Sequence, residues 1–348
     1  MASRNSSLDR RRILGAGFAL PLVAVGSGQA QGARNIAGPH DVVTLDRMEI
    51  VDEVSGRALP TRAFFPKKPG RYPGIVFSHG FGGSFKTFPN TGELWASHGY
   101  VVLHPTHMDS LQFPDPRVDP ADAAVMRKFL AARGSLDPAS RQAFVEVLNR
   151  RYFLTRRLDD INCLLRLLTS GGGGLSDTVR DQIDTRHMGM SGHSFGGYTT
   201  LICAEATLTP PLDYPLPSGF SSFMMMSGQG PGRMGLTEAS FKELRSPFMA
   251  TTGTLDFGAD GETPPWRLKP YDLSPPGSKY SVVVDGFRHM DFDPAVDPLV
   301  LSPGADRLRS LQIAFWNATL KSDPKALAFL NIAAKASSPS EGVHVMRR

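Results

Sequence analysis

Short apolar runs alternate with longer amphipathic stretches along most of this chain. Alternating or continuously apolar patterns predict strands at residues 42–50, 57–65, 72–78, 100–105, 187–190, 219–227, 247–252 and 279–284. Apolar residues at helical spacing predict helices at residues 87–98, 121–133, 138–150, 156–168, 198–206 and 308–320. The first two strands are expected to pair antiparallel, and the strand–helix–strand order after them gives right-handed crossovers. We therefore expect an α/β fold with a mostly parallel central sheet, helices on both faces, residues 279–284 as the last strand and 308–320 as the closing helix.

Residues 111–151 differ from the rest of the chain in character. They carry many charges and two amphipathic helical patterns, and they lie between two predicted parts of the sheet. This predicts a small helical insertion that lies across the carboxyl edge of the sheet and covers part of the crevice there. Residues 34–348 as a whole are expected to form a single domain.

The first 33 residues are not expected to belong to this fold. Residues 9–14 resemble a twin-arginine export motif, and the apolar region 13–25 is too short to span a bilayer as a mature helix. Small residues follow, with a plausible cleavage site at 28–30. We predict a twin-arginine-type signal peptide at 1–33 and a periplasmic or extracellular mature protein without a membrane span. The alternative is a membrane anchor that is never cut.

The composition fits one large domain, or at most two, because 41% of the 348 residues are hydrophobic. Four arginines and one aspartate in residues 1–33 supply +3 of the formal net charge of +5, so the mature protein is only weakly basic. No basic cluster with interleaved aromatic residues occurs, and no nucleic-acid partner is expected. The two cysteines, Cys163 and Cys203, fall in predicted helices. We favour two buried thiols, and a disulfide between them is the alternative.

The motif Gly-His-Ser-Phe-Gly at 192–196 has the G-x-S-x-G pattern of a nucleophile elbow. It stands between the predicted strand 187–190 and the predicted helix 198–206, which is the context that such an elbow requires. The residues two before and two after the nucleophile must lack side chains, and both are glycine. Ser194 is therefore the candidate nucleophile. Ser191 is a weaker one, because His193 stands where a glycine is needed, and His193 itself is expected to support the elbow.

Two further segments resemble ligand sites only in part. The loop His-Gly-Phe-Gly-Gly-Ser at 79–84 follows a predicted buried strand and could cradle an anion, but it lacks the ending of a nucleotide phosphate loop. The run His-Pro-Thr-His-Met-Asp at 104–109 has potential metal ligands, but its proline blocks a regular helix and no further ligands occur at recognisable spacing. We therefore expect no metal, and we interpret 104–109 as a strand-end loop near the pocket.

Three groups needed for acyl transfer follow three predicted strands, in the order Ser194, Asp256 and His289. The carboxyl ends of parallel strands meet at one edge of a sheet, so these side chains are predicted to form a catalytic triad. Less well placed alternatives are Asp260, Asp285, Asp291, Asp293 and His187. The oxyanion hole needs two N–H donors, for which the candidates are the backbone amides of Phe81 and Phe195.

These motifs together resemble the α/β-hydrolase superfamily, and more narrowly the bacterial serine hydrolases known as predicted dienelactone hydrolases, which are similar to platelet-activating-factor acetylhydrolases and polyester-cleaving cutinases. The matching pieces are residues 76–83, 95–102, 192–197, 253–256 and 286–289, within a span from about Val42 to Leu320. The resemblance implies the α/β-hydrolase fold, a cofactor-free serine esterase and oxyanion amides at Phe81 and Phe195. One departure is that dienelactone hydrolase proper uses a cysteine nucleophile, whereas this chain has Ser194, which favours a general carboxylesterase.

The expected activity is hydrolysis of short-acyl carboxylic esters by a secreted enzyme that acts on a small-molecule ester and is favoured to be a monomer. The residues expected to line the substrate site are apolar: Phe85, Trp266, Phe287 and Met290. An unpaired charge would lose its hydration in such a pocket, which favours a neutral acyl group. The alternatives are a lipase-like or cutinase-like hydrolase of polyesters or phospholipids, a metal-free perhydrolase, and a non-catalytic binding protein on the same fold.

Overall fold

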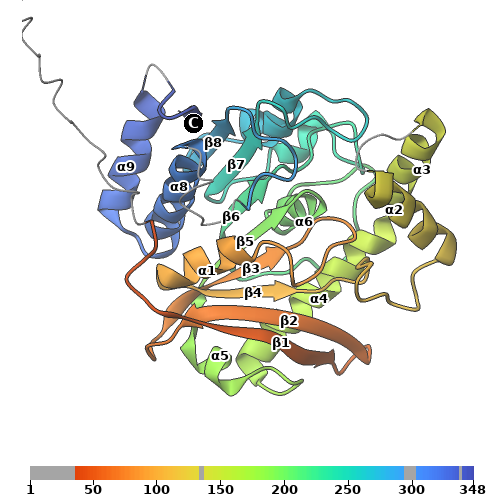
Figure 1. Cartoon of the computed structure of the whole chain (residues 1–348), viewed down its shortest axis with the longest axis horizontal. Coiled ribbons are helices and arrows are strands. Elements are labelled where there is room, and N and C mark those ends of the chain that lie inside the picture. The colour runs from red at the N-terminus through yellow and green to blue at the C-terminus, as the bar shows by residue number, and fades with distance from the viewer. Residues whose placement is uncertain (1–35, 133–136, 294–302, 337–338) are drawn as a thin grey trace, which may run out of the picture. The chain divides into compact units, whose positions relative to one another are not determined.

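The central feature of the structure, a computed structural model, is one nine-stranded sheet in the order β1-β2-β4-β3-β5-β6-β7-β8-β9 (Figure 1). The structure describes residues 36–132, 137–293, 303–336 and 339–348, and the residues from Ile36 to Arg348 form one compact unit. The predicted signal peptide at 1–33 lies outside the described residues. The strands are β1 (Val42–Asp52), β2 (Arg57–Pro66), β3 (Tyr72–Ser78), β4 (Val101–Pro105), β5 (Ile183–His193), β6 (Phe220–Met226), β7 (Phe248–Gly253), β8 (Lys279–Val284) and β9 (Val343–Arg347).

The sheet is parallel in its centre and antiparallel at both edges. Strands β4, β3, β5, β6, β7 and β8 pair parallel, whereas β1 pairs antiparallel with β2, β2 with β4, and β8 with β9. The register places Ser78, the last residue of β3, opposite Gly192 of β5. The segments after these two strands therefore leave the sheet side by side, which brings the glycine-rich loop and the predicted elbow together.

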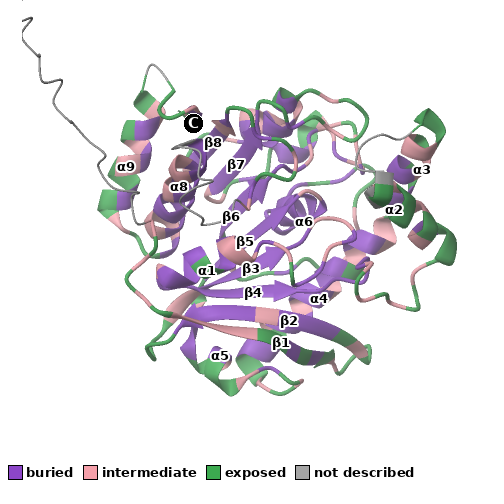
Figure 2. Cartoon of the chain, viewed as in Figure 1, coloured by how far each residue is buried: buried purple, intermediate pink, exposed green. Residues whose placement is uncertain are grey.

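Helices cover both faces of the sheet, as the strand–helix alternation predicted. One apolar core lies between the sheet and the helices α4 (Arg151–Ser170), α5 (Asp177–Gln182) and α6 (Phe195–Cys203). A second core packs α1 (Pro89–Ser97), α8 (Pro303–Leu320) and α9 (Pro324–Lys335) against the other face. Burial of both faces explains why the central strands are apolar without alternation (Figure 2). The methionine run of β6 is wholly buried in these cores.

The end of the chain differs from the sequence-based prediction. Residues 279–284 are not the last strand and 308–320 is not the closing helix, because α9 and the edge strand β9 follow. Strand β9 pairs on one side only, and one of its five residues is buried, so its apolar pattern is too weak to predict a strand. Strand β5 also begins earlier than predicted, at Ile183, because residues 184–187 are polar and 185–187 are partly or fully exposed, which interrupts the apolar pattern.

The predicted insertion forms α2 (Pro120–Ala132) and α3 (Pro138–Leu148), which lie side by side before α4 (Figure 1). The ring of Phe144 in α3 lies 6.0 Å from that of Phe81, so α3 reaches the loop that follows β3. Shorter elements complete the fold: the 3₁₀ helices η1 (Glu238–Phe241) and η2 (Pro264–Leu268), and helix α7 (Lys269–Leu273). Within the described ranges, the helices all fall short of the length and apolarity that crossing a membrane demands.

Candidate active site

Ser194 stands on a sharp turn between β5 and α6. Its backbone has φ 57° and ψ −114°, a positive-φ conformation that costs a non-glycine residue free energy. The Ser194 N–H donates to the carbonyl of Met226, which fixes the turn against β6. The side chain is half-buried, whereas the alternative Ser191 is fully buried and donates to the carbonyl of Met224. The structure therefore presents Ser194, and not Ser191, at the end of the strand.

Glycine is required on both sides of this turn. A Cβ on Gly196 would lie 1.8 Å from the carbonyl oxygen of Ser78, and one on Gly192 would lie 2.4 Å from the backbone of Gly196. These are backbone contacts that no side-chain movement relieves. The need for glycine at both positions, which the motif predicted, thus follows from how closely the elbow approaches the end of β3.

His289 and Asp256 meet Ser194 from the loops after β8 and β7. His289 Nε2 lies 2.9 Å from Ser194 Oγ, and His289 Nδ1 lies 3.0 Å from Asp256 Oδ1. Asp256 is fully buried, and the hydroxyl of Thr252 donates to its second oxygen at 3.0 Å. The three side chains predicted from strand ends are therefore brought into one hydrogen-bonded series. With Nδ1–H directed at the carboxylate, Nε2 is free to accept the Ser194 proton.

His193 lies directly beside this series, as expected for a residue that supports the elbow. Its Nε2 is 2.6 Å from the carbonyl oxygen of His289, and the two rings lie 4.8 Å apart. Burial lowers the pKa of His193 to about 3, so its ring is neutral and donates to that carbonyl. His193 thus joins the elbow to the His289 loop.

Two residues at the triad were not predicted from the sequence. Ser227, the residue after β6, has its Oγ 2.6 Å from His289 Nδ1. Arg267, in η2, is 2% exposed and places Nε 3.0 Å from Asp256 Oδ1. A serine after a strand and an arginine in a polar loop carry no motif. Only the assembled sheet edge shows that they belong to the site.

These contacts set the ionisation of the triad. Burial alone would raise the pKa of Asp256, but the hydrogen bond from His289, the charge of Arg267 and the hydrogen bond from Ser227 bring it below its ordinary value. Burial lowers the pKa of His289, the bond to Asp256 opposes this, and the charge of Arg267 adds to the lowering. The pKa of His289 therefore lies below its ordinary value, which keeps the imidazole neutral and able to act as a base at neutral pH.

Phe81 and Phe195, whose backbone amides are the predicted oxyanion donors, have ring centroids 5.0 Å apart. Phe195 is the first residue of α6, where the N–H has no partner within the helix. Within the described part of the chain, neither the Phe81 nor the Phe195 N–H meets a protein acceptor. Two such donors beside Ser194 Oγ are what an oxyanion hole requires.

A buried arginine braces the loop that carries Phe81. Arg157 of α4 is fully buried and makes a two-point ion pair with Asp109, at 2.8 and 2.7 Å. It also donates to the carbonyl of His79 and lies 4.7 Å from the centre of the Phe195 ring. Asp109 in turn accepts the N–H of Gly82 at 2.9 Å. The run 104–109 therefore supports the loop after β3, in keeping with its interpretation as a strand-end loop.

The sequence carries a signal for Arg157 in the pattern of α4. The buried stripe of α4 includes Phe153, Leu154, Leu158 and Ile161, and Arg157 falls within it at helical spacing. A charged residue on an apolar stripe must have a buried partner, because an unpaired buried charge is strongly unfavourable. Its partner, Asp109, lies 48 residues away in the chain, so no local sequence pattern identifies it.

A second serine, histidine and aspartate lie beneath the same loop. His107 Nε2 is 2.8 Å from Ser78 Oγ, and His107 Nδ1 is 2.8 Å from Asp160 Oδ2. Asp160 also pairs with Arg57, and all four side chains are buried. Burial, followed by the nearby charge of Arg157, holds the pKa of His107 well below its ordinary value. The serine, histidine and aspartate of this group are buried and join β3, the segment after β4 and α4.

The four residues predicted to line the substrate site lie in different environments. Phe85 is buried against the ring of Phe113, and Phe287 is buried in the second core. Trp266 is half-buried and its Nε1–H donates to the carbonyl of Pro231, whereas Met290 is 72% exposed next to His289. Trp266 and Met290 therefore present surface to solvent near the triad.

The alternative acidic and histidine candidates have partners elsewhere. Asp260 pairs with Arg233, Asp285 with His344, and His187 with Asp184. Asp291 accepts the N–H of Arg288 within its own loop. Asp293 accepts the N–H and the hydroxyl of Thr91, at the start of α1. None of these contacts reaches the Nδ1 of His289, where Asp256 lies.

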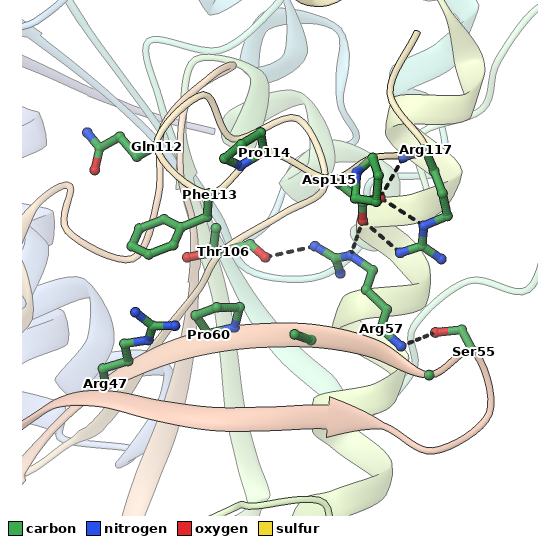
Figure 3. A pocket seen from close by; sticks show the side chains of 13 residues that line it. Arg47, Ser55, Arg57, Pro60, Thr106, Gln112, Phe113, Pro114, Asp115 and Arg117 are labelled. Carbon is green, nitrogen blue, oxygen red and sulfur yellow. Dashed lines mark hydrogen bonds and ion pairs between the residues drawn. The ribbon is translucent and has the colours of Figure 1, made fainter. Parts of the chain in front are cut away.

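A cavity of about 590 Å³ lies between the β1–β2 hairpin and residues 112–117 (Figure 3). Its guanidinium groups are already paired: Arg57 donates to Asp115 and to the carbonyl of Thr106, and Arg117 donates to Asp115. No residue of the predicted triad lines it. In the part of the chain that the structure describes, no group of three or more histidine, cysteine or acidic side chains could hold a metal ion. Cys163 and Cys203 are both buried free thiols.

Two comparisons with known proteins agree with this geometry. The family described as platelet-activating factor acetylhydrolase, isoform II, matches residues 31–113, which include the loop with Phe81. Cutinase 1 of Thermobifida cellulosilytica is 25% identical over 142 residues, which are 41% of this chain. The match spans only 38% of that cutinase. Both similarities agree with the resemblance that the motifs predicted, to serine hydrolases of the α/β-hydrolase type that cleave carboxylic esters.

Proposed function

We propose that this chain is a secreted carboxylesterase with the α/β-hydrolase fold, in which Ser194, His289 and Asp256 hydrolyse short-acyl esters. The observation that carries the proposal is the series from Ser194 Oγ through His289 to Asp256, which ends at a half-buried serine on a strained turn. The amides of Phe81 and Phe195 complete the set of groups that acyl transfer needs.

In the proposed reaction, Ser194 Oγ attacks the ester carbonyl carbon while its proton passes to His289 Nε2. The carbonyl oxygen becomes negative and accepts hydrogen bonds from the two amides. The bond to the alcohol oxygen then breaks, and His289 gives its proton to the departing alcohol. Water attacks the acyl-enzyme, again losing a proton to His289, and the acid leaves with Ser194 restored. Asp256 orients the imidazole and stabilises its charged form throughout.

The charge around the site favours a neutral acyl group. Arg157 and Arg267 are the buried cations near the triad, and each is engaged by a carboxylate and by backbone carbonyls. Neither is free to bind a carboxylate or phosphate on the substrate. Helix α3 packs on Phe81 through Phe144, and we propose that the insertion bounds the acyl side of the site. Both features support short, uncharged acyl chains over long or anionic ones.

A panel of p-nitrophenyl esters tests the substrate class. We expect kcat/KM to be highest for acetate or butyrate and to fall for palmitate. A steady rise to acyl chains of sixteen carbons would instead indicate a lipase. Acetate with hydrogen peroxide tests the perhydrolase alternative, and cutinase-like activity, suggested by the similarity to Cutinase 1, is tested with a polyester film.

Labelling with a fluorophosphonate separates a hydrolase from a binding protein on the same fold. We expect stoichiometric labelling at Ser194, identified by peptide mass, and none in Ser194→Ala. The absence of labelling in the folded wild type would contradict the proposed activity.

Export by the twin-arginine route is the remaining part of the proposal and rests on the sequence at 9–14. Changing Arg10 and Arg11 to lysine should retain the precursor in the cytosol. Secretion of the double variant at the wild-type level would refute this route.

A further inference from the structure

Arg267 touches every part of the candidate triad except Ser194. Its Nε lies 3.0 Å from both Asp256 Oδ1 and the Asp256 carbonyl oxygen. Its Nη1 donates to the carbonyls of Ser227 and Gly228, at 3.0 and 2.7 Å. Its Nη2 donates to the carbonyl of Phe257 at 2.8 Å and lies 3.3 Å from His289 Nδ1. One buried side chain thus joins the loops that follow β6, β7 and β8.

Arg267 and His289 contact the same carboxylate oxygen of Asp256. Asp256 Oδ1 faces both His289 Nδ1 and Arg267 Nε, each at 3.0 Å, while Oδ2 accepts the Thr252 hydroxyl. The carboxylate oxygen that orients the imidazole is therefore shared with a permanent cation. A guanidinium keeps its charge at every accessible pH, so this sharing does not depend on conditions.

We propose that Arg267 is a positioning residue that holds the Asp256 carboxylate within hydrogen-bonding distance of His289. Because Arg267 and His289 contact the same carboxylate oxygen, Arg267 also sets the lower pH limit at which His289 works as a base. This inference rests on the proposed function in one respect, that His289 is the base for Ser194. It adds a determinant of pH dependence that the triad alone does not supply.

The physical argument concerns the two protonation states of His289. An imidazolium is attracted to Asp256 and repelled by Arg267, which lies at a similar distance. Arg267 therefore offsets part of the stabilisation that Asp256 gives to the charged ring. In its absence Asp256 would favour the imidazolium, and His289 would remain protonated and inactive to a higher pH.

Among the residues that the structure describes, the other groups in contact with the His289 ring carry no charge. His193, from β5, is neutral because burial lowers its pKa to about 3. Ser227, after β6, and Ser194, at the elbow, are neutral hydroxyl groups. Asp256 and Arg267 are thus the charged groups in direct contact with the ring.

The test is the pH dependence of kcat/KM for a neutral ester, with wild type, Arg267→Gln and Arg267→Lys. The wild-type acid limb should have its midpoint below the ordinary histidine value of about 6.5. In Arg267→Gln the midpoint should rise by about one pH unit, since an opposing charge at contact distance is removed. Arg267→Lys keeps the charge and should hold the midpoint near that of wild type, with a lower kcat because an ammonium cannot reach all four carbonyls.

Arg233→Gln is the matched control. Arg233 also pairs with carboxylates, Asp260 and Glu262, but it lies outside the triad, so its removal should leave the midpoint unchanged. An acid limb in folded Arg267→Gln that coincides with the wild-type limb would overturn the proposal and leave Arg267 a structural residue.

Carbon-13 NMR titration of His289, assigned by comparison with His289→Asn, gives a readout that needs no substrate. Burial also lowers the pKa of His289, so the comparison with Arg267→Gln decides: a midpoint that rises in the folded variant supports the inference, whereas an unchanged midpoint, or a wild-type midpoint at or above about 6.5, contradicts it. A midpoint that rises in Arg267→Gln while the wild type hydrolyses no ester would refute the proposed function and leave the role of Arg267 intact.

Discussion

The molecule contains two hydrogen-bonded Ser–His–Asp groups, and their comparison separates what makes such a group reactive from what makes it stable. Ser194, His289 and Asp256 are joined at 2.9 and 3.0 Å, and Ser78, His107 and Asp160 at 2.8 and 2.8 Å. Each aspartate also pairs with a buried arginine, Arg267 in the first group and Arg57 in the second. By hydrogen bonding alone the two are nearly equivalent.

They differ in the backbone and surroundings of the serine. Ser194 has a positive φ of 57° at the first turn of a helix, is half-buried, and precedes Phe195, one of the two residues whose amides are the proposed oxyanion donors. Ser78 lies in strand β3 with no exposed surface, and its Oγ accepts a hydrogen bond from Arg157 at 3.0 Å. A nucleophile therefore needs an open approach and donors for the developing oxyanion, and the hydrogen-bonded series supplies neither.

The largest difference should appear when the two serines are changed. Ser194→Ala should lower kcat by several orders of magnitude without unfolding the protein, because triad members act as a unit. Ser78→Ala should keep most of the activity and lose thermal stability, since it leaves buried partners unsatisfied. Ester hydrolysis and thermal melting of both variants are the measurements. Comparable losses of kcat in the two folded variants would contradict the distinction.

The two aspartates should respond in opposite ways. Asp256→Asn should reduce kcat about 10⁴-fold, because the amide favours the wrong tautomer of His289. Asp160→Asn breaks a buried ion pair and should cost about 3–5 kcal/mol of the free energy of unfolding, with a much smaller effect on kcat. Denaturant unfolding and steady-state kinetics decide between these outcomes. Full activity in Asp256→Asn would move the acid role to another carboxylate, with Asp260 the next to test.

The amides beside Ser194 are the next point of difference. Phe81→Pro removes one N–H and should cost about 3 kcal/mol of transition-state stabilisation, or more if the loop is distorted. Phe81→Ala keeps the N–H but loses ring contacts to Phe195, Phe153 and Phe144, so a smaller loss of kcat is expected. If alanine is as damaging as proline in kcat, the side chain and not the amide is the important group.

The smallest effect should come from the insertion, which contacts the Phe81 ring through Phe144. Phe144→Ala removes a ring that packs on Phe81 and should raise kcat/KM for hexanoate relative to acetate by a few-fold, the scale of one or two methylene groups in an apolar pocket. Phe113→Ala, which lies against Phe85, is the matched control. An unchanged ratio in Phe144→Ala would place the acyl group elsewhere.

The sequence alone was enough to predict strands β1 to β8, the antiparallel first pair and the strand ends from which Ser194, Asp256 and His289 extend. This was possible because buried strands are read from short apolar runs, and because the carboxyl ends of parallel strands gather at one edge. The need for glycine at 192 and 196 also followed from the motif. The edge strand β9 was not predicted, because a strand that pairs on one side carries little apolar pattern. Helix α9 was not predicted either.

Only the tertiary structure decided what surrounds the three side chains. Arg267 reaches Asp256 across 11 residues and His289 across 22, and Arg157 reaches Asp109 across 48. No spacing in the sequence marks such pairs, because a buried charge finds its partner through the packing of separate strands and helices. The same holds for the substrate site, where packing buried Phe85 and Phe287 and left Met290 exposed. Local patterns determine which elements form, whereas the close packing of those elements determines which polar groups share a low-dielectric space and so how they ionise.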